Sequence, residues 1–247
     1  MKKFLIALQF LTILSIRIKS EIKEKDFGES LVYFPVVGAL IGLIITFSLF
    51  IFSSLPQLVT VTLILIILIL ITGGIHLDGF ADTCDGFYSN SSKEKILEIM
   101  RDSRIGTMGA IGVVCLLLLK FTLLISIPRE ILWKSLIMMT IFARWSQALA
   151  CFLSNYPRKE GKAKYFVEYA GLKELLIGGL FTVISFLLLM KIEGLILFIL
   201  SLVFIFLFIN YTKRKIGGMT GDTIGATSEL AEVAVILFLV VYHTGLF

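Results

Sequence analysis

The sequence predicts an all-α membrane protein, a bundle of seven or eight hydrophobic helical segments within a single domain that covers residues 1–247. Two observations predict this fold class. Of the 247 residues, 57% are hydrophobic and 17% are charged, whereas a soluble domain has roughly 45–50% and about 25%. The apolar residues also gather into runs of about 18 to 25, the length that crosses a hydrocarbon layer roughly 30 Å thick. These runs exclude water-soluble enzyme folds and disordered chains.

The apolar segments follow one another along the whole chain. A short one covers 4–16, and seven longer ones cover 31–55, 58–76, 105–127, 131–154, 172–190, 194–211 and 226–247. Each is predicted to be a helix, because a spanning segment must satisfy its own backbone hydrogen bonds. The short segment contains Gln9 and is followed by Arg17 rather than by a cleavage site of small residues. It is therefore not a removed signal peptide, and it is either a surface helix or a short span.

The basic residues predict the orientation of these helices. They concentrate in four loops, namely the loop before Leu31 and the loops 77–104, 155–171 and 212–222. The turns between these loops carry none, one or two. Because basic loops face the cytoplasm, the four loops are predicted to lie inside and the C-terminus outside. We expect a multi-pass membrane protein, with the lipid bilayer as its partner and no nucleic acid.

A first cluster of acidic residues follows the segment 58–76. Asp78, Asp82 and Asp85 stand at i, i+4 and i+7 between glycines, and these offsets fall on one face of a helix. Three carboxylates on one face repel each other unless a cation neutralises them. Oxygen ligands without cysteine or histidine spacing favour magnesium, which binds through one or two carboxylates together with substrate phosphates.

A second cluster precedes the last segment. Asp222, Glu229 and Glu232 again share a helical face, behind glycines that let backbone N–H groups approach an anion. Between the two clusters, Arg101 and Arg104 stand at a glycine-rich helix start that suits phosphate recognition. By the predicted topology, both clusters open to the cytoplasm.

Other charged or polar residues stand close to these clusters or inside apolar segments. His76 is either a base or a structural hydrogen-bonding group. Arg144, in the middle of 131–154, is expected to face the bundle interior and to find a partner. Lys120 is expected to pair or to reach the membrane surface rather than to catalyse.

The chain closely resembles the cobalamin synthase family, the adenosylcobinamide-GDP ribazoletransferases. The resemblance runs nearly end to end and is carried by four blocks: FPVVGALIG at 34–42, GGIHLDGFADTCDGF at 73–87, LEIMRDSRIGTMG at 97–109 and GGMTGDTIGATSELAE at 217–232. It implies a magnesium-dependent, multi-pass enzyme of the cytoplasmic (inner) membrane that completes the lower nucleotide loop of vitamin B12. In the implied reaction, a hydroxyl of α-ribazole or of its 5′-phosphate attacks adenosylcobinamide-GDP, giving adenosylcobalamin or its phosphate and releasing GMP. The sequence leaves open a homo-oligomer or a complex with other cobalamin-assembly enzymes.

We combine this implied reaction with the residue pattern in one mechanistic hypothesis. Asp78, Asp82 and Asp85 hold one or two magnesium ions, and Asp222 and Glu229 complete the metal shell or position the nucleophile. The phosphate oxygens are stabilised by Arg101 and Arg104, and the hydroxyl proton goes to His76 or to one of the carboxylates.

Four other functions compete with this interpretation. A CDP-alcohol phosphotransferase would show an arginine shortly after Asp78-Gly79, and a prenyl-transferring enzyme would show a second aspartate-rich motif; neither is present. A cation-coupled transporter would place its carboxylates near the middle of the membrane, on broken helices. A non-catalytic membrane subunit of a cobalamin-assembly complex is the remaining alternative.

Overall fold

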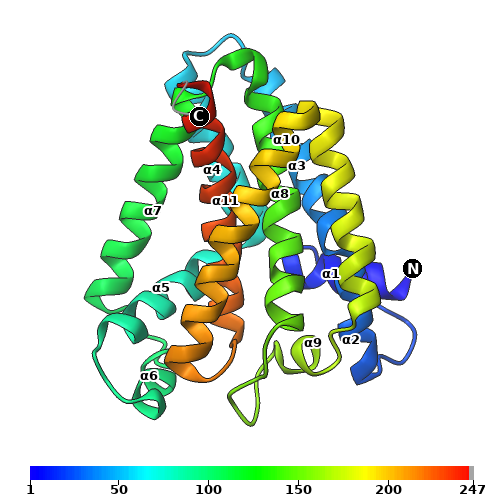
Figure 1. Ribbon diagram of the computed structural model, residues 1–247, viewed down its shortest axis with the longest axis vertical. Coiled ribbons are helices and arrows are strands. Elements are labelled where there is room, and N and C mark those ends of the chain that lie inside the picture. Colours follow the sequence, from blue (N-terminus) through cyan, green and yellow to red (C-terminus); the bar gives the residue numbers. More distant parts are fainter. Residues whose placement is uncertain (245–247) are drawn as a thin grey trace.

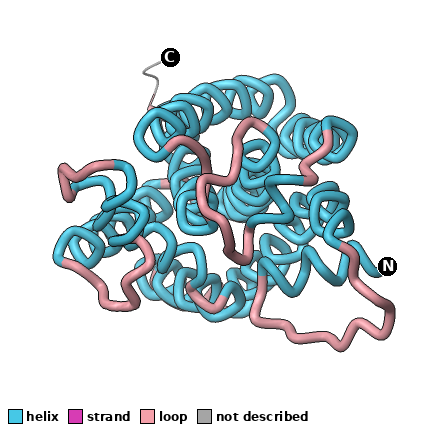
Figure 2. Tube along the Cα trace, turned by 90° about the horizontal axis from the view of Figure 1, so that it is seen from below, coloured by secondary structure: helices cyan, strands magenta, loops and turns pink. Residues whose placement is uncertain are grey.

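The computed structural model describes residues 1–244, and these residues form helices and loops without a strand (Figure 1, Figure 2). The predicted all-α class is therefore confirmed. The helices are α1 (Lys2–Leu11), α2 (Glu24–Ser30), the 3₁₀ turn η1 (Leu31–Tyr33), α3 (Phe34–Ile51), α4 (Gln57–Thr72), α5 (Ile75–Tyr88), α6 (Lys93–Ile99), α7 (Thr107–Ser126), α8 (Arg129–Phe152), α9 (Lys164–Glu168), α10 (Leu172–Ile216) and α11 (Gly221–His243). The predicted segment 226–247 begins five residues earlier than expected, and its last three residues lie outside the described part of the chain.

The number of spanning helices is lower than the predicted seven or eight. Five helices in the described part are long and apolar enough to cross a membrane, and a sixth results if α4 and α5 are counted as one span. One reason is that α1 has ten residues, which is too short for a layer of roughly 30 Å. The other is that α10, which contains the predicted segments 172–190 and 194–211, counts as one helix although it is broken in its middle.

Helix α10 folds back on itself in its middle. Met190 and Lys191 leave the helical conformation, with φ of −134° and 52°, and a Cβ added to Gly194 would lie 2.2 Å from the carbonyl oxygen of Phe186. Residues eight apart in a straight helix are separated by about 12 Å. The two arms of α10 therefore run in opposite directions and diverge from the bend, so the polypeptide passes along the bundle twice (Figure 1).

Helix α1 stays at one end of the bundle. Lys2 forms an ion pair with Asp26 of α2, and Lys3 forms one with Glu29 of the same helix. These contacts fix the start of α1 beside the loops at the lower end of Figure 1. The structure thus favours a surface helix over a short span.

The four basic loops lie at the same end of the molecule. The segments around α2, α5 and α6, α9, and the connection from α10 to α11 all occupy the lower end in Figure 1, and Figure 2 looks onto this end. The turns after α3 and α7, the break in α10 and the end of α11 lie at the opposite end. This arrangement agrees with the alternation that the basic residues predict.

Two features of the bundle position the polar clusters. Helix α8 is the central helix. In its most apolar stretch of 18 residues 89% is buried, and it packs against α3, α10 and α11. Helices α4 and α5 meet at an angle of 89°, and the bend is made by Gly73 and Gly74 with φ of 63° and 67°. Only glycine adopts this left-handed conformation freely. The bend turns α5 across the bundle, so that its aspartates approach α11.

Candidate active site

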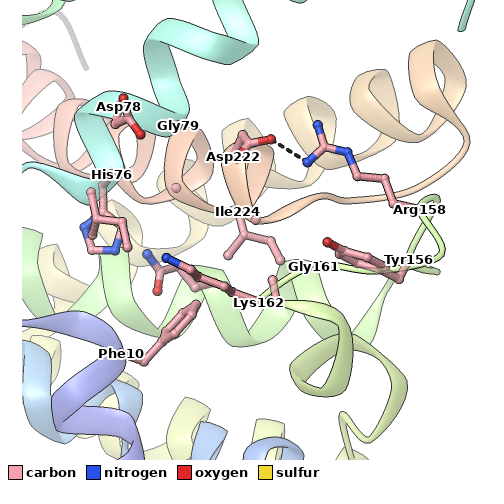
Figure 3. Close-up of a pocket in the computed structure, with 15 residues that line it drawn as sticks. Phe10, His76, Asp78, Gly79, Tyr156, Arg158, Gly161, Lys162, Asp222 and Ile224 are labelled. Carbon is pink, nitrogen blue, oxygen red and sulfur yellow. Dashed lines mark hydrogen bonds and ion pairs between the residues drawn. The ribbon is translucent and has the colours of Figure 1, made fainter. Parts of the chain in front are cut away.

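A pocket of about 280 Å³ lies where the first turns of α5 and α11 meet the loop before α9 (Figure 3). It lies at the end of the bundle that carries the basic loops. Its lining includes His76, Asp78 and Gly79 of α5, Gly221, Asp222, Ile224 and Gly225 of α11, Tyr156, Arg158, Gly161 and Lys162 of the loop, Gln147 of α8 and Phe10 of α1. Because the N-terminal ends of two helices face the pocket, it favours a negatively charged ligand.

Glycines allow α5 and α11 to cross closely at this pocket. A Cβ added to Gly79 would lie 2.7 Å from the carbonyl oxygen of Asp222, and one added to Gly225 would lie 3.3 Å from the Cα of His76. The backbones therefore touch where a side chain would separate them. This close approach brings Asp78 and Asp222 to the same pocket.

We predict that Gly79→Ala destabilises the protein by about 1–3 kcal/mol, because the new methyl group forces the two backbones apart. Gly221→Ala is the matched control, since its Cβ would meet Ala163 at an ordinary 3.5 Å. Thermal unfolding of both variants in detergent tests this, and equal unfolding temperatures would contradict the close crossing.

The carboxylates of α5 and α11 face each other with few counter-charges. Asp222 accepts a hydrogen bond from Arg158 Nη1 at 2.9 Å and a longer one from Thr220 Oγ1 at 3.3 Å. Asp78 is exposed to the pocket, and Asp82 lies one turn further along α5, close enough to Asp78 and Asp222 for their charges to repel. Neither Asp78 nor Asp82 has an ion-pair partner among residues 1–244.

Asp85 serves a structural purpose at the start of α7. Its two carboxylate oxygens accept hydrogen bonds from the backbone N–H groups of Gly106 and Gly109, each at 2.7 Å. A Cβ on either glycine would collide with this carboxylate. Asp85 therefore caps α7 from a neighbouring helix, which accounts for the glycine-rich start that the sequence associated with phosphate binding.

Glu229 lies in a separate cluster, away from the aspartates. It is buried and contacts Lys120 of α7, which also contacts Glu232. Arg144 of α8 donates hydrogen bonds to Ser228 and, at 3.1 Å, to Glu232. The structure thus gives Arg144 and Lys120 the buried partners that the sequence led us to expect, and it does not bring Glu229 together with Asp78.

The two arginines of the predicted phosphate site lie outside the pocket. Arg104 forms a two-pronged ion pair with Asp102 on the exposed loop, and its hydrogen bonds lower the pKa of Asp102 to about 2. Arg101 is also exposed and is not among the residues that line the pocket. Burial raises the pKa of Tyr156, so its hydroxyl stays neutral at the pocket edge.

Two polar side chains of the pocket lack partners. His76 is 4% exposed, and its Nδ1 has no hydrogen-bond partner among residues 1–244. Both polar atoms of the Gln147 side chain are in the same situation. Buried polar groups without partners cost free energy, so these side chains are poised for a ligand or for water.

The sequence did not single out the two cations that the pocket contains. Arg158 and Lys162 stand in the loop 155–171, whose basic residues also served to predict orientation. In Figure 3, Arg158 points at Asp222 and Lys162 extends across the pocket towards the side of His76. Their sequence signal was only that of a basic loop, which four loops share.

A comparison with known protein families identifies the family of the chain that forms this pocket. The family model for cobalamin-5-phosphate synthase matches residues 3–240. The chain belongs to the cobalamin-5-phosphate synthase family. This confirms the family that the sequence blocks indicated, and the matched range includes every residue of the pocket.

Relatives of this cobalamin-5-phosphate synthase family member carry the name of one enzyme. The chain is 40% identical to an adenosylcobinamide-GDP ribazoletransferase of Acetivibrio thermocellus, over 98% of each chain. It is 38% identical to one of Clostridium acetobutylicum, over 99% of this chain and 98% of the relative. It is 39% identical to one of Alkaliphilus metalliredigens, over 100% and 98%. No solved structure matches the chain.

Proposed function

We propose that this protein joins adenosylcobinamide-GDP to α-ribazole or α-ribazole 5′-phosphate, giving adenosylcobalamin or its 5′-phosphate and GMP. The observation that carries the proposal is the pocket in which Asp78 and Asp222 meet Arg158 and Lys162, in a chain of this family. A diphosphate substrate needs neutralisation of its charge more than it needs covalent help from the protein. The pocket combines the cations and the oxygen ligands that such a substrate requires.

The residues of the pocket fit magnesium. Their free donors are carboxylate oxygens, which a hard cation prefers, and Asp78 and Asp82 lack a counter-charge among the described residues. No group of three acidic, histidine or cysteine side chains in the described part is arranged to hold a metal alone. An ion bound here would therefore need substrate phosphates beside one or two carboxylates. We assign Asp78 and Asp222 to it, with Asp82 behind them.

Bound magnesium supplies neutralisation of the diphosphate charge, and the other steps belong to the protein's side chains. The nucleophile's hydroxyl oxygen bonds to the phosphorus that carries cobinamide, while the bond from this phosphorus to the bridging oxygen breaks and GMP leaves with that oxygen. Lys162 and Arg158 bind the phosphate oxygens. His76, whose Nδ1 is unpartnered in the pocket, accepts the hydroxyl proton.

The location of the pocket follows from the topology. It lies at the end of the bundle with the four basic loops, and basic loops stay in the cytoplasm. We therefore assign the active site to the cytoplasmic face of the inner membrane, where nucleotide substrates are present.

The reaction is tested by GMP release from adenosylcobinamide-GDP by the purified protein. We expect release that requires both α-ribazole and magnesium, and that stops when the metal is chelated. Release that proceeds equally without α-ribazole, or no release under any condition, would overturn the assignment.

A further inference from the structure

A second hollow of about 420 Å³ adjoins the pocket. Phe10, Gly161 and Lys162 line both spaces, so the two meet along these residues. The remaining walls come from α1, α2, α9 and the loop before α2, at the end of the bundle that carries the basic loops (Figure 1). We call this hollow the aromatic cleft, and its characteristic residues are Gln9, Phe10, Ile22, Phe27, Tyr165 and Phe166.

Aromatic rings form one wall of the aromatic cleft and hold each other in place. The rings of Phe10 and Phe166 lie 4.2 Å apart, those of Phe27 and Phe166 lie 5.2 Å apart, and those of Phe27 and Tyr165 lie 6.0 Å apart. Phe166 is fully buried, whereas Phe10, Phe27 and Tyr165 are partly exposed. The exposed rings rest on a fixed base, which is the arrangement on which a flat ring stacks.

Few polar groups line the aromatic cleft. No carboxylate is among its lining residues. The amide nitrogen of Gln9 already donates to the carbonyl oxygen of Ile16 at 2.7 Å. The one charge in the cleft is that of Lys162, which stands at the boundary with the pocket and has no ion-pair partner among residues 1–244. The cleft is thus apolar inside and cationic at its inner edge.

We propose that the aromatic cleft binds the base of the nucleophile, with the methyl-substituted benzimidazole ring of α-ribazole stacked on Phe27 and Tyr165. The ribose then passes Phe10 and Lys162 and reaches the pocket, where its hydroxyl meets the diphosphate. This inference rests on the proposed function, because it names the place of one substrate of that reaction.

The chemistry of the cleft favours this ring over the other parts of the substrates. Guanine carries donors and acceptors along its edges that need hydrogen-bond partners when buried, and the cleft offers hardly any. The corrin ring is far larger and is rimmed by amides. A benzimidazole with methyl groups is flat and apolar, so stacking and burial suffice to hold it.

The test is a comparison of three variants by steady-state kinetics with both substrates. Stacking of a base on an aromatic ring contributes strongly to binding, so we expect Phe27→Leu to raise the KM for α-ribazole about tenfold. In this variant the KM for adenosylcobinamide-GDP is expected to stay within twofold of that of the unchanged protein. Phe27→Tyr keeps an aromatic ring and is expected to leave the KM for α-ribazole unchanged. Phe47→Leu, an equally apolar change at an exposed position of α3, is the matched control and leaves both constants unchanged.

A further variant, Ile22→Asp, and a binding measurement test this inference separately from the proposed reaction. Ile22 stands in an exposed loop, so Ile22→Asp spares the fold and places a carboxylate in the apolar cleft. Equilibrium dialysis with α-ribazole alone is expected to show about tenfold weaker binding to this variant and to Phe27→Leu, whether or not GMP release is detected. Unchanged α-ribazole binding and KM in both variants, or a rise confined to adenosylcobinamide-GDP, would overturn the inference while leaving the transferase reaction intact.

Discussion

Asp78→Asn is expected to lower turnover about 100-fold or more while leaving the protein as stable as before. Asp78 is exposed to the pocket and has no ion-pair partner among the described residues. Replacing its carboxylate with an amide therefore leaves the free energy of unfolding unchanged. The lost charge acts on the reaction instead, because Asp78 is assigned to the magnesium ion, and a metal that neutralises the charge of the transition state is worth several kcal/mol. The neighbouring repulsion with Asp82 is also relieved, which favours folding slightly.

Two measurements check this result. Turnover is followed as a function of magnesium concentration, where the variant is expected to need more metal for half-maximal activity. Glu98→Gln is the matched control, since Glu98 pairs with Lys95 at an exposed position of α6 and such pairs contribute little. If Asp78→Asn kept full turnover and the same magnesium dependence, the metal site would not involve Asp78.

The sequence predicted the fold because hydrophobic length is a local property. A run of about 20 apolar residues makes a spanning helix wherever it occurs, so six of the eight predicted segments appear within helices of membrane length, and a seventh, 58–76, forms α4, which reaches that length only together with α5. The reversal in α10 was visible only as a gap between two predicted segments. Lys191 adopts φ of 52° there, a conformation for which its residue type gives no signal.

The site was predicted less completely because it depends on contacts between distant segments. Asp78 and Asp222 lie on different helices, and both line one pocket, as the mechanistic hypothesis expected. Glu229 shares a helical face with Asp222, but seven residues of α-helix separate them by about 10 Å along the axis. Helical periodicity shows which face of a helix a residue occupies, but not how far along the helix axis it lies. The sequence therefore grouped Glu229 with the aspartates, whereas in the structure Glu229 pairs with Lys120.

Asp85 and Arg158 also depend on contacts between distant segments. Asp85 has a spacing that suggests a role it does not show, and Arg158 lies in the pocket without any motif to indicate it. Asp85 has the spacing of a ligand, but its capping of Gly106 and Gly109 follows from where α7 begins in space. Arg158 has no motif at all, and it enters the pocket because the loop before α9 folds over α11. A partner 64 residues away leaves no trace in local sequence.

Glu232→Gln is expected to destabilise the protein more than any other conservative change discussed above. Glu232 is 1% exposed and contacts both Lys120, 2% exposed, and Arg144, which is fully buried. With Glu229, these four side chains carry two positive and two negative charges. The amide leaves two cations and one carboxylate in an apolar interior, where breaking a buried pair costs about 3–5 kcal/mol.

The unfolding temperature in detergent is expected to fall by about 10 °C, because 1 kcal/mol corresponds to roughly 2–4 °C for a chain of this size. Glu130→Gln is the matched control, since Glu130 is exposed at the start of α8 and has no buried partner to lose. Lys120→Met combined with Glu232→Gln restores neutrality and fills the lysine's space with an apolar chain. This double variant is expected to recover part of the lost stability. An unfolding temperature of Glu232→Gln equal to that of Glu130→Gln would mean that the four charges do not depend on each other, and the buried cluster would then contribute no more than exposed ion pairs do.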